Sequence, residues 1–127
     1  MFEHRHVSII DDDQSVRVAL GSLARSLGMS VRLFASAEAF LAAEGALDND
    51  LIVTDVQMPG MGGLALLELL HQRGGTVPAI VLTAFPEAAI RERARAAGAR
   101  AFLAKPFDGD AIIDCMRHAL APAGSAG

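Results

Sequence analysis

The feature that most constrains the fold is a repeated alternation between short apolar runs and longer segments with helical periodicity. The apolar runs are three to five residues long and largely uncharged, which is typical of strands buried on both faces of a sheet. In the first segment between them, apolar residues fall at 16, 19, 20, 23, 24 and 27, the spacing of one helix face. Five strand–helix units in succession predict a parallel sheet with helices on both faces and right-handed crossovers.

Cap and turn residues set the expected boundaries of these elements. Asp13 and Ser36 are expected to cap the first two helices, and Pro86 to occupy the first turn of the fourth. Gly28 and Gly45 are expected to end the first two helices. The fold class is therefore α/β, a doubly wound, five-stranded parallel sheet of the (βα)5 type. We expect strands over 7–10, 31–34, 51–54, 78–82 and 101–103, and helices over 16–27, 37–43, 64–73, 86–97 and 108–120.

The composition suits one small domain. The chain has 127 residues, and its 52% hydrophobic content allows one sizeable core. The single Cys115 excludes an internal disulfide and favours a reducing compartment. The net charge of −4 argues against nucleic acid as the main partner, and no apolar stretch approaches the roughly 20 residues of a membrane span. We therefore expect residues 1–120 to form one soluble, cytoplasmic domain, with a linker-like tail over 121–127.

Chemically reactive side chains follow four of the predicted strands at the same end. The first strand is followed by Asp11 to Asp13, the third by Asp55, the fourth by Thr83 and the fifth by Lys105. In an open α/β sheet, ligands bind beyond the carboxyl ends of the strands. The fold would gather these residues from four regions of the sequence at one edge, which predicts a single site.

The aspartates predict a site for Mg²⁺. Adjacent carboxylates repel one another, and closing them against Asp55 would raise a pKa or require a cation. Mg²⁺ takes one or two carboxylates and keeps several waters. A single aspartate before a helix more often caps it, but one cap does not use three aspartates. We expect Asp13 to cap the first helix, and Asp11 and Asp12 to serve the site.

Asp55 is the candidate nucleophile of this site. A carboxylate after a buried strand can attack phosphorus and form an aspartyl phosphate, although a lone aspartate there could equally bond the backbone of its own turn. Phosphoryl transfer chiefly needs positioning and neutralised charge. Lys105, the only lysine of the chain, is the compact cation that suits a phosphate. Thr83 adds a hydroxyl, whereas composition alone predicts an ordinary core role for Phe102.

In combination, these motifs resemble the receiver domain of bacterial two-component response regulators. The resemblance covers about residues 7–120. Two segments, 10–13 and 35–41, look most like the nitrogen-fixation regulator branch, whose members usually carry a C-terminal helix-turn-helix DNA-binding domain. The resemblance implies a sheet with the strand order 2-1-3-4-5. It rests on the acid pair Asp11-Asp12, the turn Asp55-Val-Gln-Met-Pro59, the pair Thr83-Ala84 and the run Lys105-Pro106-Phe107.

The resemblance implies how the site would bind a phosphoryl group and a metal ion. Asp55 would accept the phosphoryl group from a histidine of a sensor kinase. Asp12, Asp55 and the backbone carbonyl of Gln57 would bind Mg²⁺ directly, with Asp11 acting largely through water. Lys105 would contact a phosphoryl oxygen, and its bond to the following proline is cis in the family.

The resemblance also implies a conformational switch and a partner surface. Thr83 would move to hydrogen-bond the phosphoryl group, and Phe102 would follow it from an outward to an inward rotamer, near Ala84. Such domains dimerise or meet partners through the fourth helix, fifth strand and fifth helix. Charges on the two helices could pair across a two-fold axis, although a solvated face is the usual role of such charges. The charged residues are Arg91, Arg93 and Arg95 on the fourth helix and Asp108, Asp110 and Asp114 on the fifth.

Some positions depart from the commonest family pattern. The aromatic switch residue is Phe102 where many members have tyrosine, so no hydroxyl anchors either rotamer. Phe85 follows Thr83 by two residues and Gln57 follows Asp55 by two, so both would flank the path of hydrolytic water. An apolar Phe85 would shield that path, which predicts a fairly long-lived phosphoryl group.

The sequence therefore favours a phosphorylation switch that is not a turnover enzyme. A magnesium-dependent phosphatase with an aspartyl phosphate would need a second acid two residues after Asp55, where Gln57 stands. A flavodoxin-like cofactor carrier would need a glycine- or hydroxyl-rich loop after the first strand, where three aspartates would repel phosphate. Two forms remain open: a receiver that controls transcription through an output domain absent from this chain, and a stand-alone regulator or phosphorelay protein. Neither form predicts direct nucleic-acid contact by this domain.

Overall fold

Strands and helices alternate along the chain and build one parallel sheet. The computed structural model describes residues 2–43 and 49–121. The five strands pair in the order β2-β1-β3-β4-β5, all in parallel, so the predicted fold class and strand order are confirmed. The elements are β1 (His6–Ile10), α1 (Gln14–Ser26), β2 (Ser30–Phe34), α2 (Ala37–Ala42), β3 (Leu51–Asp55), α3 (Gly63–Gln72), β4 (Ala79–Thr83), α4 (Ala88–Ala96), β5 (Ala99–Ala104) and α5 (Gly109–Leu120).

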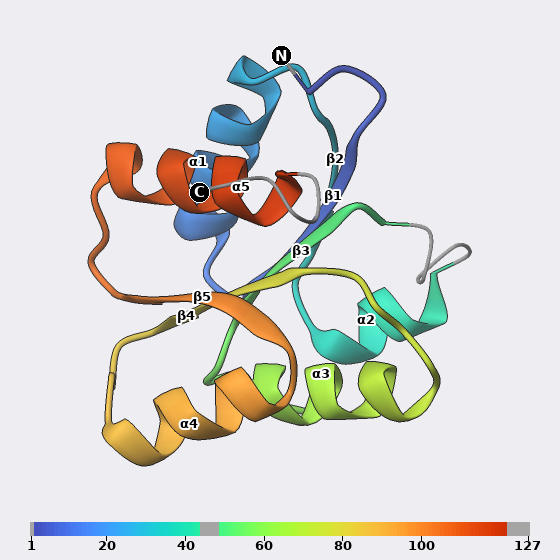
Figure 1. Ribbon diagram of the computed structural model, residues 1–127, viewed down its shortest axis with the longest axis vertical. Helices are drawn as coiled ribbons and strands as arrows, with labels where there is room; N and C mark the ends of the chain where they lie inside the picture. Colours follow the sequence, from blue (N-terminus) through green and yellow to red (C-terminus); the bar gives the residue numbers. More distant parts are fainter. Residues whose placement is uncertain (1, 44–48, 122–127) are drawn as a thin grey trace.

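Helices cover both faces of the sheet, which explains why its central strands are largely apolar. The helices α1 and α5 lie on one face, and α2, α3 and α4 lie on the other (Figure 1). Alternate residues of a strand point to opposite faces. In β3, Leu51 and Val53 therefore pack with the first pair of helices, and Ile52 packs with the other three. Because β3 and β4 are buried along their whole length, the side chains at their carboxyl ends are firmly placed.

The caps of the first two helices form as predicted. The Asp13 carboxylate accepts a hydrogen bond from the backbone N–H of Ser15 at 2.9 Å, and Ser36 caps α2 in the same manner. Gly28 follows the end of α1 with a φ of +90°, a conformation that favours glycine. The predicted end of the second helix at Gly45 lies outside the described residues.

The fourth helix begins later than predicted. It starts at Ala88 with Glu87 as its N-cap, so Pro86 lies before the helix and the prediction that it occupies the first turn was wrong. The backbone N–H of Glu87 donates to the carbonyl oxygen of Phe85, and the N–H of Phe85 donates to the hydroxyl of Thr83. These local bonds keep the chain in a loop beyond the end of β4, and the helix can begin only after it.

Other boundaries differ by smaller amounts. The strands β3 and β4 extend to include Asp55 and Thr83. Asp108 is the N-cap of α5, because its carboxylate accepts the backbone N–H of Asp110. The strand β5 is longer than predicted, because pairing with β4 continues through alanines that add little to a hydrophobic pattern. Among the described residues, no helix is both long and apolar enough to cross a bilayer.

Candidate functional site

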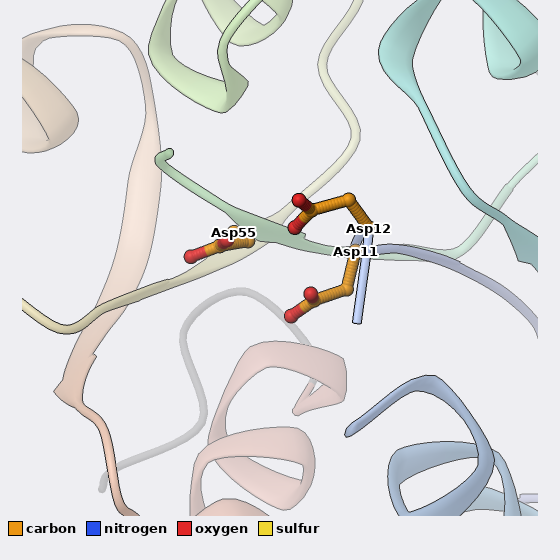
Figure 2. A group of neighbouring side chains, drawn as sticks. All are labelled: Asp11, Asp12 and Asp55. Atoms are coloured by element: carbon orange, nitrogen blue, oxygen red, sulfur yellow. The ribbon is translucent and has the colours of Figure 1, made fainter. Parts of the chain in front are cut away.

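The fold brings the aspartates that follow β1 together with the aspartate that ends β3. One oxygen each from Asp11, Asp12 and Asp55 lies within 4.8 Å of the others. Figure 2 shows the three side chains at neighbouring strand ends, with the carboxylates of Asp11 and Asp12 extending toward that of Asp55. Asp11 and Asp55 are buried, whereas Asp12 is exposed. The cluster therefore has a protected interior and one side open to solvent.

Backbone contacts hold Asp11 in place. Its side chain accepts the backbone N–H of Asp13 at 2.9 Å, and its own N–H donates to the carbonyl oxygen of Phe34 in β2. Arg17 donates to the carbonyl oxygen of Asp11 at 2.7 Å. The three consecutive aspartates thus divide as predicted, with Asp13 at the helix cap and the other two at the carboxylate cluster.

Lys105 places its ammonium between the two buried carboxylates. Its Nζ lies 2.9 Å from Oδ2 of Asp11 and 3.4 Å from Oδ1 of Asp55. Burial lowers the pKa of Lys105, but the hydrogen bond and the negative charge of Asp11, together with those of Asp55, outweigh burial, and the pKa is raised. The lysine therefore remains charged at neutral pH. As the resemblance implied, the Lys105–Pro106 peptide bond is cis.

The electrostatics of Asp55 show that one lysine does not neutralise the cluster. Burial and the charge of Asp11 raise the pKa of Asp55 to about 6, while the charge and hydrogen bond of Lys105 lower it and Asp12 adds a smaller repulsion. Carboxylate oxygens are hard ligands that suit Mg²⁺, and a divalent cation would relieve this repulsion. The residues present therefore fit a metal site, and Asp11, Asp12 and Asp55 can hold the ion.

The turn between β3 and α3 is built tightly around Asp55. A Cβ atom on Gly63 would lie 2.0 Å from the carbonyl oxygen of Asp55, so only glycine fits there. The carboxylate of Glu38, in α2, accepts the backbone N–H of Met61 at 2.9 Å. That hydrogen bond lowers the pKa of Glu38. Sequence reasoning missed this role of Glu38, because nothing near the residue indicates that α2 meets a loop more than twenty positions away.

Thr83 is bonded to the two residues that were expected to flank the path of hydrolytic water. Its hydroxyl donates to the side-chain oxygen of Gln57 at 2.9 Å and accepts the backbone N–H of Phe85 at 3.0 Å. The side chain of Thr83 is buried, whereas Gln57 is exposed and Phe85 is 58% exposed. The hydroxyl proton is therefore already used in a bond to an exposed amide, a contact that the spacing of these residues did not reveal.

Phe102 lies apart from the carboxylates, on the α4 side of β5. It is half-buried at the edge of the core beneath α2, α3 and α4. The guanidinium of Arg91 covers its ring, with the Cζ atom 4.7 Å from the ring centroid. The core role that composition predicted and the mobile role that the resemblance implied are thus both compatible with its position.

The other arginines of α4 are engaged within the chain. Arg93 binds Glu68 of α3 through two hydrogen bonds, at 2.9 and 2.7 Å, and Arg95 pairs with Glu92 on its own helix. An exposed ion pair contributes little to stability, but it occupies the side chain. Charge pairing between copies of this chain would have to compete with these contacts.

A doubly wound parallel sheet with clustered aspartates, a buried threonine and a lysine at its carboxyl edge defines a receiver-type phosphoacceptor fold. Residues 7–117 match the family described as the response regulator receiver domain, and the chain belongs to that family. Members of this family are phosphorylation-dependent signalling switches, and response regulators receive the phosphoryl group from sensor kinases.

Relatives and solved structures agree with this assignment. The chain is 45% identical over 120 residues to the transcriptional regulatory protein FixJ of Azorhizobium caulinodans, covering 94% of this chain and 57% of the relative. It is 34% identical to the DNA-binding transcriptional regulator NtrC of Salmonella typhimurium, covering 90% of this chain and 24% of the relative. The crystal structure of FixJ-N superposes with a TM-score of 0.81 at 36% identity, covering 94% and 95% of the two chains. The chain spans about half the length of the first curated relatives it matches.

Proposed function

We propose that Asp55 is the phosphoacceptor of a two-component signalling pathway. The observation that carries this proposal is the position of the Asp55 carboxylate, buried at the end of β3 within reach of the Lys105 ammonium and among two further carboxylates. An oxygen of Asp55 attacks the phosphorus of a phosphohistidine on a sensor histidine kinase. The new P–O bond forms as the P–N bond breaks, and the imidazole leaves with its electron pair.

The residues around Asp55 would prepare it for this reaction. Asp12, Asp55 and the backbone carbonyl of Gln57 would hold Mg²⁺, with Asp11 acting largely through water. When bound, Mg²⁺ supplies positive charge that neutralises the phosphoryl oxygens and keeps the carboxylates ionised. Lys105 would exchange part of its contact with the two aspartates for a phosphoryl oxygen. A pKa of about 6 for Asp55 keeps it mainly ionised at neutral pH even without the metal.

Phosphorylation would then change the surface of the domain. The hydroxyl of Thr83 would release the side chain of Gln57 and donate a hydrogen bond to the phosphoryl group instead. Phe102 would turn inward behind it and leave its place beneath Arg91 of α4. The surface formed by α4, β5 and α5 would then dimerise or bind a partner. The domain would remain a switch that gains and loses its own phosphoryl group, without turning over a separate substrate.

The output we propose is control of transcription through a DNA-binding domain outside this chain. The names of the relatives support this, since FixJ is a transcriptional regulatory protein and NtrC a DNA-binding transcriptional regulator. In this arrangement, residues 1–120 would be the cytoplasmic receiver, without direct nucleic-acid contact, and 121–127 the start of a linker. The alternative is a stand-alone regulator or phosphorelay protein that acts by protein contact.

Phosphorylation with a small donor tests the central claim. We would incubate the protein with acetyl phosphate and Mg²⁺ and measure the intact mass. The wild type is expected to gain one phosphoryl group and Asp55→Asn none. Asp13→Asn is the matched control, because asparagine also caps a helix and should leave phosphorylation unchanged. An Asp55→Asn protein that gains the same mass as the wild type would exclude Asp55 as the acceptor.

A further inference from the structure

One arginine of α4 is engaged with an aromatic ring and not with a carboxylate. The Cζ atom of Arg91 lies 4.7 Å from the centroid of the Phe102 ring, within the roughly 6 Å range of a cation–π contact. The two other arginines of the same helix pair with glutamates. Arg91 is exposed, so its guanidinium can leave the ring without leaving a buried charge behind.

The register of the sheet connects this contact to Thr83. The strand pairing sets Val81 opposite Phe102 and Thr83 opposite Ala104. Residues two apart on a strand share a face, so the side chains of Thr83 and Phe102 lie on the same face of the sheet. The ring of Phe102 lines an open groove together with Arg91 and residues of α4. If the Phe102 ring turns inward from this groove, it loses its contact with the guanidinium of Arg91.

We propose that Arg91 is a positioning residue that holds Phe102 in its outward place and thereby favours the resting state. This inference rests on the proposed function, because it assumes that Phe102 turns inward when Asp55 is phosphorylated. A phenylalanine ring has no hydroxyl to anchor it, so a cation on its face is the kind of contact that can hold it. An exposed contact of this type shifts a two-state equilibrium about two- to fivefold.

Binding of a phosphoryl mimic measures this shift, because apparent affinity is proportional to the population of the competent state. We would titrate beryllofluoride into Mg²⁺-saturated protein by calorimetry, at concentrations where sedimentation shows a monomer. Arg91→Met keeps a long side chain without the charge, and its apparent affinity is expected to rise about two- to fivefold. The apparent affinity of Arg91→Lys should lie between those of Arg91→Met and the wild type. Arg95→Met, an exposed arginine of the same helix paired with Glu92, is the matched control and should bind as the wild type does.

Fluorine NMR reports the position of the Phe102 ring, which would not change if Arg91 only supported the stability of the fold. Protein labelled with 4-fluorophenylalanine has six signals, and Phe102→Leu assigns the relevant one. The mimic is expected to shift the Phe102 signal of the wild type, and Arg91→Met should shift it in the same direction before any mimic is added. If the wild type binds and its ring moves, but Arg91→Met behaves as Arg95→Met in both measurements, the inference is wrong and the proposed function stands. If the wild type neither binds nor moves its ring, both are wrong.

Discussion

The two halves of the site are held in different ways. On the β1 and β3 side, Asp11 is bonded to the backbone, and the carbonyl of Asp55 packs so closely against Gly63 that a side chain would not fit. On the β4 and β5 side, Thr83 is bonded to the exposed Gln57, and Phe102 lies against an exposed arginine. A fixed side suits a carboxylate that must meet phosphorus in one orientation, whereas exposed side chains can release their partners at small cost. The comparison predicts large effects from changes on the fixed side and small effects on the adjustable side.

The strongest disturbance of the fixed side is Gly63→Ala. Its Cβ would lie 2.0 Å from the Asp55 carbonyl oxygen and 2.8 Å from Oγ1 of Thr54, so the turn must shift. We expect a loss of about 3 kcal/mol in the free energy of unfolding, measured by urea denaturation, and a severe loss of phosphorylation. Gly109→Ala is the control, because its Cβ would meet only Leu23 at an ordinary 3.9 Å. Equal stability of the two variants would show that the turn is not tightly fixed.

The second test of the fixed side is the pH dependence of Asp55→Asn. The folded pKa of Asp55, about 6, is above the ordinary value of 3.8 for an aspartate. A raised pKa means that the stability contributed by the protonated carboxyl is complete below pH 3.8 and is lost as pH rises through 6. We therefore expect Asp55→Asn to unfold at the same free energy as the wild type near pH 3.8 but to be more stable, by about 2–3 kcal/mol, near pH 7.5.

Mg²⁺ provides the control for this pH effect. A cation bound to the cluster would remove much of the repulsion on Asp55, so added Mg²⁺ should narrow the gap between wild type and Asp55→Asn at pH 7.5. Urea denaturation of both proteins across pH, with and without Mg²⁺, gives the comparison. If the difference in the free energy of unfolding between the wild type and Asp55→Asn is constant over pH, the fold does not raise the pKa of Asp55.

Sequence reasoning predicted the features that have strong local signals. Asp13 and Ser36 cap helices because a short polar side chain before a helix has one favoured use, and the strand ends bring Asp55 close to Lys105 because all strands of a parallel sheet point one way. The helix start at Pro86 was wrong, because a local preference of proline was overridden by bonds within the loop before it. The strand order needed the family resemblance, since alternation alone does not order the strands.

The contacts that sequence reasoning missed join distant segments, and each involves at least one exposed side chain. The hydrogen bond from Thr83 to Gln57, the anchoring of Met61 by Glu38 and the stacking of Arg91 on Phe102 each depend on where two elements meet after packing. No period or motif encodes such a meeting. These contacts are concentrated around the loops and the outer helices. In contrast, the sequence correctly predicted that the residues at the buried strand ends lie close together.

On the adjustable side, Phe85→Ala tests whether an exposed ring protects the phosphoryl group. Phe85 is 58% exposed and lies in the loop beyond Thr83, so its ring can shield the site without supporting the core. We expect the variant to lose its phosphoryl group a few times faster than the wild type, followed by intact mass after removal of the donor. Val18→Ala is the control, since Val18 is equally apolar and 50% exposed but lies on α1. A Phe85→Ala protein that loses phosphate no faster would contradict the shielding.

The smallest effect is expected for Gln57→Met, which removes the acceptor of the Thr83 hydroxyl and leaves the backbone carbonyl of residue 57 in place. Because Gln57 is exposed and water can replace its amide, the free energy of unfolding should change by less than about 1 kcal/mol. Thr83 keeps its bond from the N–H of Phe85 but is freed toward the phosphoryl group, so beryllofluoride should bind slightly more tightly. Gln72→Met, an exposed glutamine at the end of α3, should leave binding unchanged. Weaker binding of beryllofluoride by Gln57→Met would mean that Gln57 supports the phosphorylated state and not the resting one. Gln57 would then belong with the fixed residues of the site and not with the adjustable ones.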